Sequence, residues 1–192
     1  PAGRGVVYPI SAICLGLTSL ISLSLSNGER SFMKPNNITR MLEARKIPFT
    51  AFELPAEKLG AQETARFLGV PLEQVYKTIV VTRLEKGKPI LAVIPGTHEV
   101  DLKALARALG EKKVILPTER EAERLTGLQA GGISPLALIQ RGFQVVIDVS
   151  ARSYEAVHVS GGQRGLNIRL PVQALAELTN ASFAEISQRT TT

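Results

Sequence analysis

The sequence is poor in residues that carry several common chemistries. Its 192 residues include one cysteine, two histidines and no tryptophan, and aromatic residues make up 5% of the chain. A single cysteine excludes an internal disulfide. One cysteine and the two distant histidines, His98 and His158, cannot supply the four close ligands of a structural zinc site. We therefore predict neither a metal site nor a bound cofactor.

Motifs of three large enzyme classes are also missing. No phosphate loop ends in Gly-Lys-Ser or Gly-Lys-Thr, no Gly-x-Gly-x-x-Gly follows an expected strand, and no Gly-x-Ser-x-Gly occurs. Neither His98 nor His158 has an evident catalytic partner in the sequence, so we interpret each as a surface or packing residue. An enzyme with this sequence would work without an obvious side-chain nucleophile.

Charge is present but unevenly distributed. The chain has 23 Lys and Arg against 17 Asp and Glu, a net charge of +6 that indicates an anionic partner. Residues 6–26 carry no charge and contain the only cysteine, Cys14. Residues 1–32 have three interpretations: a transmembrane helix diluted by serines, a secretory signal, or an artefact or mis-extended reading frame. We favour the last and expect a cytoplasmic domain over 33–192 without stable membrane association.

From Met33 onward, helix caps alternate with strand patterns. We expect strands at 49–53, 75–82, 89–94, 113–116, 143–149, 155–159 and 166–170. The expected helices lie at 36–46, 62–68, 102–109, 118–125 and 171–178, with one more turn at 183–187. The short turn at 85–88 predicts an antiparallel hairpin, which excludes a purely parallel sheet. These patterns predict a single α/β domain with a mixed sheet.

Three further features allow a functional or a purely structural interpretation. Lys77 lies in the middle of an expected strand, on the face of Val75 and Ile79, where it either extends to solvent or meets an anionic or carbonyl group. The loop at 126–135 contains paired glycines, which form a plain turn or direct N–H groups at an anion or oxyanion. The loop at 159–165 either cradles phosphate or ribose or is a glycine-rich hairpin. Each feature alone indicates a function only weakly.

Four motifs occur in order over about residues 36–186: Val75-Tyr76-Lys77-Thr78, Asp101-Leu102-Lys103, Gly131-Gly132-Ile133-Ser134-Pro135 and Val159-Ser160-Gly161-Gly162-x-Arg164-Gly165-Leu166. Together they resemble the YbaK/EbsC family of Cys-tRNA(Pro) deacylases, related to the editing domain of bacterial prolyl-tRNA synthetase. The resemblance implies a largely antiparallel, barrel-like sheet flanked by helices. It also implies hydrolysis of mischarged tRNA(Pro), above all Cys-tRNA(Pro), in trans to prolyl-tRNA synthetase, which is a second candidate partner.

The resemblance also implies a set of site residues. Lys77 would be the essential lysine that holds the substrate carbonyl or terminal nucleotide, and the Gly131 backbone would face the scissile carbonyl. The implied substrate-binding residues are Phe52, Thr78, Gly132, Ser134, Ser160, Gly161, Arg164 and Asn167. Because an aminoacyl ester is already reactive, positioning and oxyanion donors can suffice. In Cys-specific members the substrate's own thiol is the implied nucleophile.

Three positions depart from the family pattern. Asn167 occupies a position where members often have aspartate, and Phe52 and Leu128 occupy positions where they have tyrosine and another aromatic residue. An amide can form hydrogen bonds but carries no charge. These changes leave alanine, or another small amino acid, open beside cysteine. They also leave open a module of the same fold that binds tRNA or a nucleotide without turnover.

Overall fold

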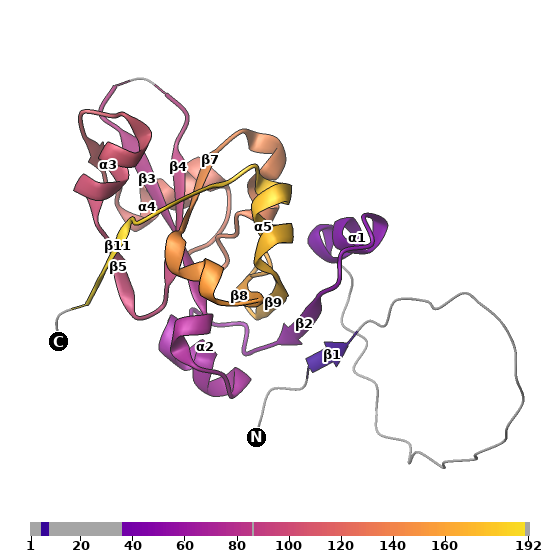
Figure 1. Cartoon of the computed structure of the whole chain (residues 1–192). Coiled ribbons are helices and arrows are strands. Elements are labelled where there is room, and N and C mark those ends of the chain that lie inside the picture. The colour runs from indigo at the N-terminus through magenta and orange to yellow at the C-terminus, as the bar shows by residue number, and fades with distance from the viewer. Residues whose placement is uncertain (1–4, 8–35, 86, 191–192) are drawn as a thin grey trace, which may run out of the picture.

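The computed structural model describes residues 5–7, 36–85 and 87–190 (Figure 1). Within residues 1–32, only Gly5–Val7 belongs to these ranges, and it forms β1, which pairs antiparallel with β2 at Thr50–Glu53. The rest of the expected N-terminal segment lies outside the described residues, so the boundary at residue 33 stays a prediction. In the described residues, no helix is both long and apolar enough to cross a membrane.

The smaller of the two main sheets has the strand order β1-β2-β9-β8, and all its neighbours are antiparallel. Its last two strands, β8 (Ala156–Ser160) and β9 (Leu166–Pro171), form a hairpin around residues 161–165. Pairing places Phe52 and Ser160 on either side of Asn167. The second glycine-rich loop is therefore the turn of this hairpin.

The larger sheet has the order β10-β7-β4-β3-β6. Its central strands confirm the predicted antiparallel hairpin, whereas the β4–β7 and β7–β10 pairs are parallel. One bridge, Val75 to His158, joins the two sheets, and the sheets do not close. The mixed α/β class is confirmed, but "barrel-like" describes the sheet only loosely. The strands are β3 (Tyr76–Arg83), β4 (Ile90–Pro95), β6 (Val114–Ile115), β7 (Gln144–Asp148) and β10 (Ser182–Ala184).

Side-chain caps explain where α1, α3 and α4 begin. The Asn36 side chain accepts from the N–H groups of the first turn of α1, Asp101 does so for α3, and Thr118 accepts from the Glu121 N–H in α4. The helices are α1 (Asn37–Ala44), α2 (Ala61–Leu68), α3 (Leu102–Leu109), α4 (Glu119–Thr126) and α5 (Val172–Thr179). Short 3₁₀ segments lie at Leu72–Gln74, Leu136–Arg141 and Val149–Ser153.

The helical turn expected at 183–187 is wrong. Residues there form β10 and β11 (Ser187–Arg189), and β11 pairs with β5 (His98–Val100). The Asp148 carboxylate accepts from the Ile186 N–H and from the Ser187 hydroxyl, which holds this segment extended. Pairing with distant strands overrides the local pattern in such short segments.

Alternation along β3 divides the core into two clusters on the two faces of the larger sheet. Val80 belongs to the cluster that α5 covers, and its neighbour Val81 belongs to the cluster that α3 covers. Figure 1 shows α3 and α5 on opposite sides of β3, β4 and β7. This division decides which way the next residues toward the start of β3, Thr78 and Lys77, can point.

Candidate functional site

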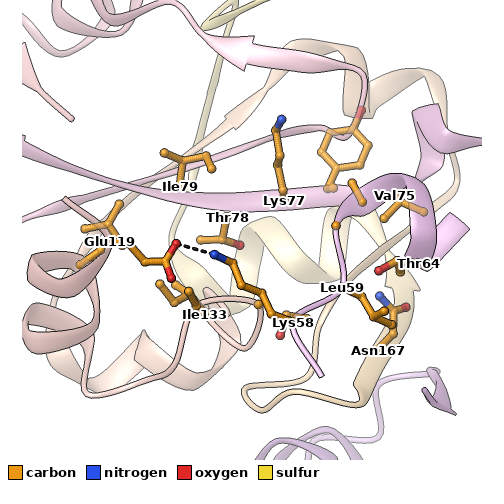
Figure 2. Close-up of a pocket in the computed structure, with 18 of the residues that line it drawn as sticks. Lys58, Leu59, Thr64, Val75, Lys77, Thr78, Ile79, Glu119, Ile133 and Asn167 are labelled. Carbon is orange, nitrogen blue, oxygen red and sulfur yellow. Dashed lines mark hydrogen bonds and ion pairs between the residues drawn. The ribbon is translucent and has the colours of Figure 1, made fainter. Parts of the chain in front are cut away.

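The first half of β3 borders a cavity of about 460 Å³ (Figure 2). β6 pairs with β3 only at Thr82 and Arg83. Within the described ranges, no strand covers residues 77–81 on that side, so the edge of the sheet stays open toward the cavity. The other walls are formed by residues 54, 57–61, 64, 116–117, 119, 122, 130–131, 133, 160 and 165–167. A concave site beside an open sheet edge is a suitable place for a ligand.

Lys77 lines this cavity from β3 and is half-buried. Figure 2 shows its side chain on the same side of the strand as Ile79, as the alternating pattern predicts, and on the opposite side from Thr78. Burial lowers the pKa of the Lys77 ammonium, and the carboxylate of Glu99 opposes this shift. Lys77 is thus a partly desolvated cation, but its side chain lies on the opposite side of β3 from Thr78 and the Lys58–Glu119 contact (Figure 2), so the structure does not bring its ammonium together with these groups.

Thr78 contributes a hydroxyl without a hydrogen-bond partner. Its Oγ1 is buried and, in the part of the chain that the structure describes, is the one buried side-chain oxygen or nitrogen left unpaired. Leaving a buried polar atom unpaired costs about 1–3 kcal/mol. Because Thr78 lines the cavity, a bound ligand could supply the missing partner.

Asn167 lines the cavity and is held from behind by His158. The Asn167 Oδ1 and the His158 Nδ1 are 3.0 Å apart, and both residues are buried. Burial lowers the pKa of His158, so near neutral pH the ring is uncharged and its Nδ1–H donates to Asn167. The Asn167 amide N–H groups remain as donors. Phe52, expected to bind substrate, lies outside the lining and packs on His158, with the ring centroids 5.4 Å apart.

Of the three site residues predicted in the first glycine-rich loop, only Gly131 lines the cavity. Gly131 has a φ of 87°. Gly132 is buried outside the lining, and its N–H donates to the Gln129 carbonyl at 2.8 Å, so this N–H is not free for an oxyanion. Ser134 is fully buried, and its hydroxyl accepts from the Leu136 N–H at the start of a 3₁₀ segment.

In the second glycine-rich loop, Ser160 and Gly165 line the cavity, whereas Gly161 and Arg164 do not. Its hydroxyl accepts from the Gly162 N–H at 3.4 Å. Gly161 is buried, and its N–H donates to the Leu166 carbonyl at 2.8 Å. A Cβ on Gly161 would lie 2.3 Å from the Leu166 Cγ, so the hairpin turn is tightly packed.

Arg164 joins the two loops instead of lining the cavity. Its Nε donates to the Ala130 carbonyl at 2.8 Å. The backbones are equally close, because a Cβ on Gly132 would lie 3.0 Å from the Arg164 nitrogen. The second loop therefore supports the first.

Two lining residues were not anticipated from the sequence. Lys58 precedes α2 and Glu119 is the first residue of α4, and their side chains form an ion pair of 2.5 Å at the cavity (Figure 2). From the sequence, charged residues such as these are expected on the solvent-exposed surface, and no motif connects two residues so far apart. Among the described residues, no group of three or more His, Cys, Asp or Glu side chains could hold a metal ion.

Comparison with known proteins places the chain in a family. The model of the aminoacyl-tRNA editing domain matches residues 56–178. A protein of Enterococcus faecalis assigned as a Cys-tRNA(Pro)/Cys-tRNA(Cys) deacylase, EbsC, is 36% identical over 84% of this chain and 98% of its own length. The proline–tRNA ligase of Geobacter metallireducens is 26% identical over 68% of this chain but only 22% of its own length. A crystal structure described as a trans-editing enzyme for prolyl-tRNA synthetase has a TM-score of 0.68 and 26% identity, and covers 81% of this chain and 99% of that one. The chain therefore belongs to the aminoacyl-tRNA editing domain family.

Proposed function

We propose that this protein hydrolyses the aminoacyl ester of mischarged tRNA(Pro) in trans, with Cys-tRNA(Pro) as its first substrate. Family membership makes it an aminoacyl-tRNA deacylase, and the deacylase relative is matched over 98% of its length. The match to 22% of a proline–tRNA ligase relates the same domain to prolyl-tRNA synthetase. The net charge of +6 favours an RNA ligand.

The observation that carries the proposal is the unpaired Thr78 hydroxyl in the cavity wall. The wall also offers the Asn167 amide, the Gly131 backbone and the open edge of β3. These groups are hydrogen-bond donors without a strong base or nucleophile among them. Such a set suits an ester that needs positioning and stabilisation of a developing oxyanion.

The predicted site residues then have two kinds of role. Lys77 and Gly131 act on the substrate carbonyl or terminal nucleotide, while Thr78, Ser160 and Asn167 bind the substrate. The other five residues act through those that line the cavity, because they hold loops or rings in place: Phe52, Gly132, Ser134, Gly161 and Arg164.

Prolyl-tRNA synthetase is the partner that would supply mischarged tRNA(Pro), and the cytoplasm is where both are used. These two assignments complete the proposal and follow from the substrate. Co-purification of tagged protein with the synthetase, with and without tRNA(Pro), tests the partnership. Recovery of tRNA(Pro) alone would contradict it.

The central test is a deacylation assay on Cys-, Ala- and Pro-tRNA(Pro). The wild type should release cysteine fastest and spare proline, and Lys77→Ala should abolish release. Turnover by Lys77→Ala at the wild-type rate would overturn the assigned role of the lysine. Release of no amino acid from any of the three would overturn the proposed function.

Thr78→Val separates an effect on catalysis from an effect on stability more clearly than Lys77→Ala does. It removes an oxygen without a protein partner, so the free energy of unfolding should stay constant or rise by up to about 1 kcal/mol. The deacylation rate should nevertheless fall about tenfold, the scale of one lost hydrogen bond in the transition state. Unchanged rates would remove Thr78 from the site.

A second candidate function is tRNA or nucleotide binding without turnover. The observation that favours it is Asn167, a neutral amide where family members often have aspartate. Binding of mischarged tRNA with no release of any amino acid would decide for it. Asn167→Asp would then be the variant in which to look for hydrolysis.

A further inference from the structure

The Lys58–Glu119 ion pair joins two walls of the cavity. Lys58 belongs to the segment between β2 and α2, and Glu119 begins α4. Their 2.5 Å contact spans the cavity in Figure 2, with Thr78 and Ile133 nearby. A ligand that enters between these walls meets both charges.

The pair also lies beside the first glycine-rich loop. A Cβ added to Gly131 would lie 3.5 Å from the Lys58 Cα and Cγ, so Lys58 packs directly on the residue proposed to face the scissile carbonyl. The ammonium and the carboxylate are therefore close to where an aminoacyl ester would react. Their positions relate them to the substrate's reactive end and not to a distant part of the tRNA.

The ion pair is inexpensive to open. The two side chains are 52% and 56% exposed. Pairs this exposed stabilise a fold by less than about 1 kcal/mol, because water and salt solvate the separated charges well. The pair therefore adds little to the stability of the fold. Replacing it by contacts with charged groups of a ligand costs little free energy.

The substrate carries both complementary charges. An aminoacyl-tRNA has an α-ammonium group on the amino acid and a phosphate on the terminal nucleotide, on either side of the ester. We propose that substrate binding exchanges the partners of this ion pair, so that Glu119 takes the α-ammonium group and Lys58 takes the terminal phosphate. This rests on the proposed function and names the substrate groups read by two residues outside the family motifs.

Three ligands test the exchange independently of hydrolysis. The first is amide-linked 3′-cysteinylamino-3′-deoxyadenosine 5′-monophosphate, the second is its N-acetyl derivative, and the third lacks the 5′-phosphate. Glu119→Gln should weaken binding of the first and third ligands about fivefold and leave the affinity for the N-acetyl ligand unchanged. Lys58→Gln should weaken binding of the first and second ligands about fivefold and leave the affinity for the phosphate-free ligand unchanged. Calorimetric dissociation constants give these ratios.

Matched controls come from the same helix. Glu121 and Arg124 form an ion pair of 3.9 Å on α4 outside the cavity lining, so Glu121→Gln and Arg124→Gln remove the same charges without touching the site. Their affinities for all three ligands should equal those of the wild type. Glu57 is a second carboxylate in the cavity wall. If Glu57→Gln, and not Glu119→Gln, removes the preference for the free amine, the assignment to Glu119 is wrong.

The double reversal Lys58→Glu/Glu119→Lys separates substrate recognition from a structural tie. It restores an ion pair but exchanges the two charges. The melting temperature should therefore equal that of the wild type, whereas the first ligand should bind the double variant at least fivefold more weakly than it binds the wild type. Wild-type affinity in the double variant, or no binding of the first ligand by the wild type, would overturn the inference. A wild type that binds with the expected pattern but hydrolyses no mischarged tRNA would instead overturn only the proposed function.

Discussion

The two glycine-rich loops of this protein each contain a pair of adjacent glycines but differ in their surroundings. Gly131 and Gly162 have nearly the same φ, 87° and 88°. A Cβ on Gly131 would meet its nearest atoms at 3.5 Å, whereas one on Gly162 would lie 2.8 Å from the Ile38 Cδ1. The first loop thus leaves room at the cavity, whereas the second loop packs tightly against core residues such as Ile38. Glycine content alone does not separate a ligand-binding loop from a packing turn.

The largest expected effect comes from Gly162→Ala. The substitution adds left-handed backbone strain and a steric overlap with Ile38, so the free energy of unfolding should fall by about 2–4 kcal/mol. Urea denaturation measures this change. A loss below 1 kcal/mol would show that the second loop has room to adjust.

Gly131→Ala is the matched variant in the first loop. It carries the backbone strain without the overlap, so the loss of stability should be about 1–2 kcal/mol. Because Gly131 lines the cavity, deacylation should fall about tenfold in protein that remains folded. Equal stability losses in the Gly131 and Gly162 variants would remove the distinction between the loops.

Arg164→Ala tests whether the second loop supports the first. Loss of the hydrogen bond from Nε to the Ala130 carbonyl should reduce stability by about 1 kcal/mol. The deacylation rate should fall by more than the tRNA affinity, because the residue positions Gly131 and does not line the cavity. A loss of tRNA affinity with a normal rate would indicate direct contact with RNA instead.

The smallest effect is a pH dependence behind the second loop, where His158 holds Asn167. Burial lowers the pKa of folded His158 below its ordinary value of 6.5, so the unfolded chain binds the proton more readily. The stability from this residue is complete above pH 6.5 and declines as the pH falls from 6.5 toward the lowered pKa. The wild type should lose stability relative to His158→Gln between pH 7.5 and 5.5. A constant difference in urea midpoint would contradict the shift.

Local signals predicted most of the elements but not the complete site. Caps such as Asn36 and Asp101 mark helix starts, and alternation along β3 places Lys77 with Ile79. Alternation cannot say where the cavity lies, because that depends on how few residues of β6 pair with β3. The contact of Lys58 with Glu119 likewise depends on folding, and β10 forms only because β7 offers an edge.

The way Asp148 holds the C-terminal segment has a consequence for biosynthesis. Its carboxylate binds the Ile186 N–H and the Ser187 hydroxyl, and β10 completes the larger sheet beside β7. A ribosome makes these residues after β7, so β7 keeps an unpaired edge until β10 has emerged. Messages truncated before Ser182 should yield chains that self-associate, although every cavity-lining residue has already been translated.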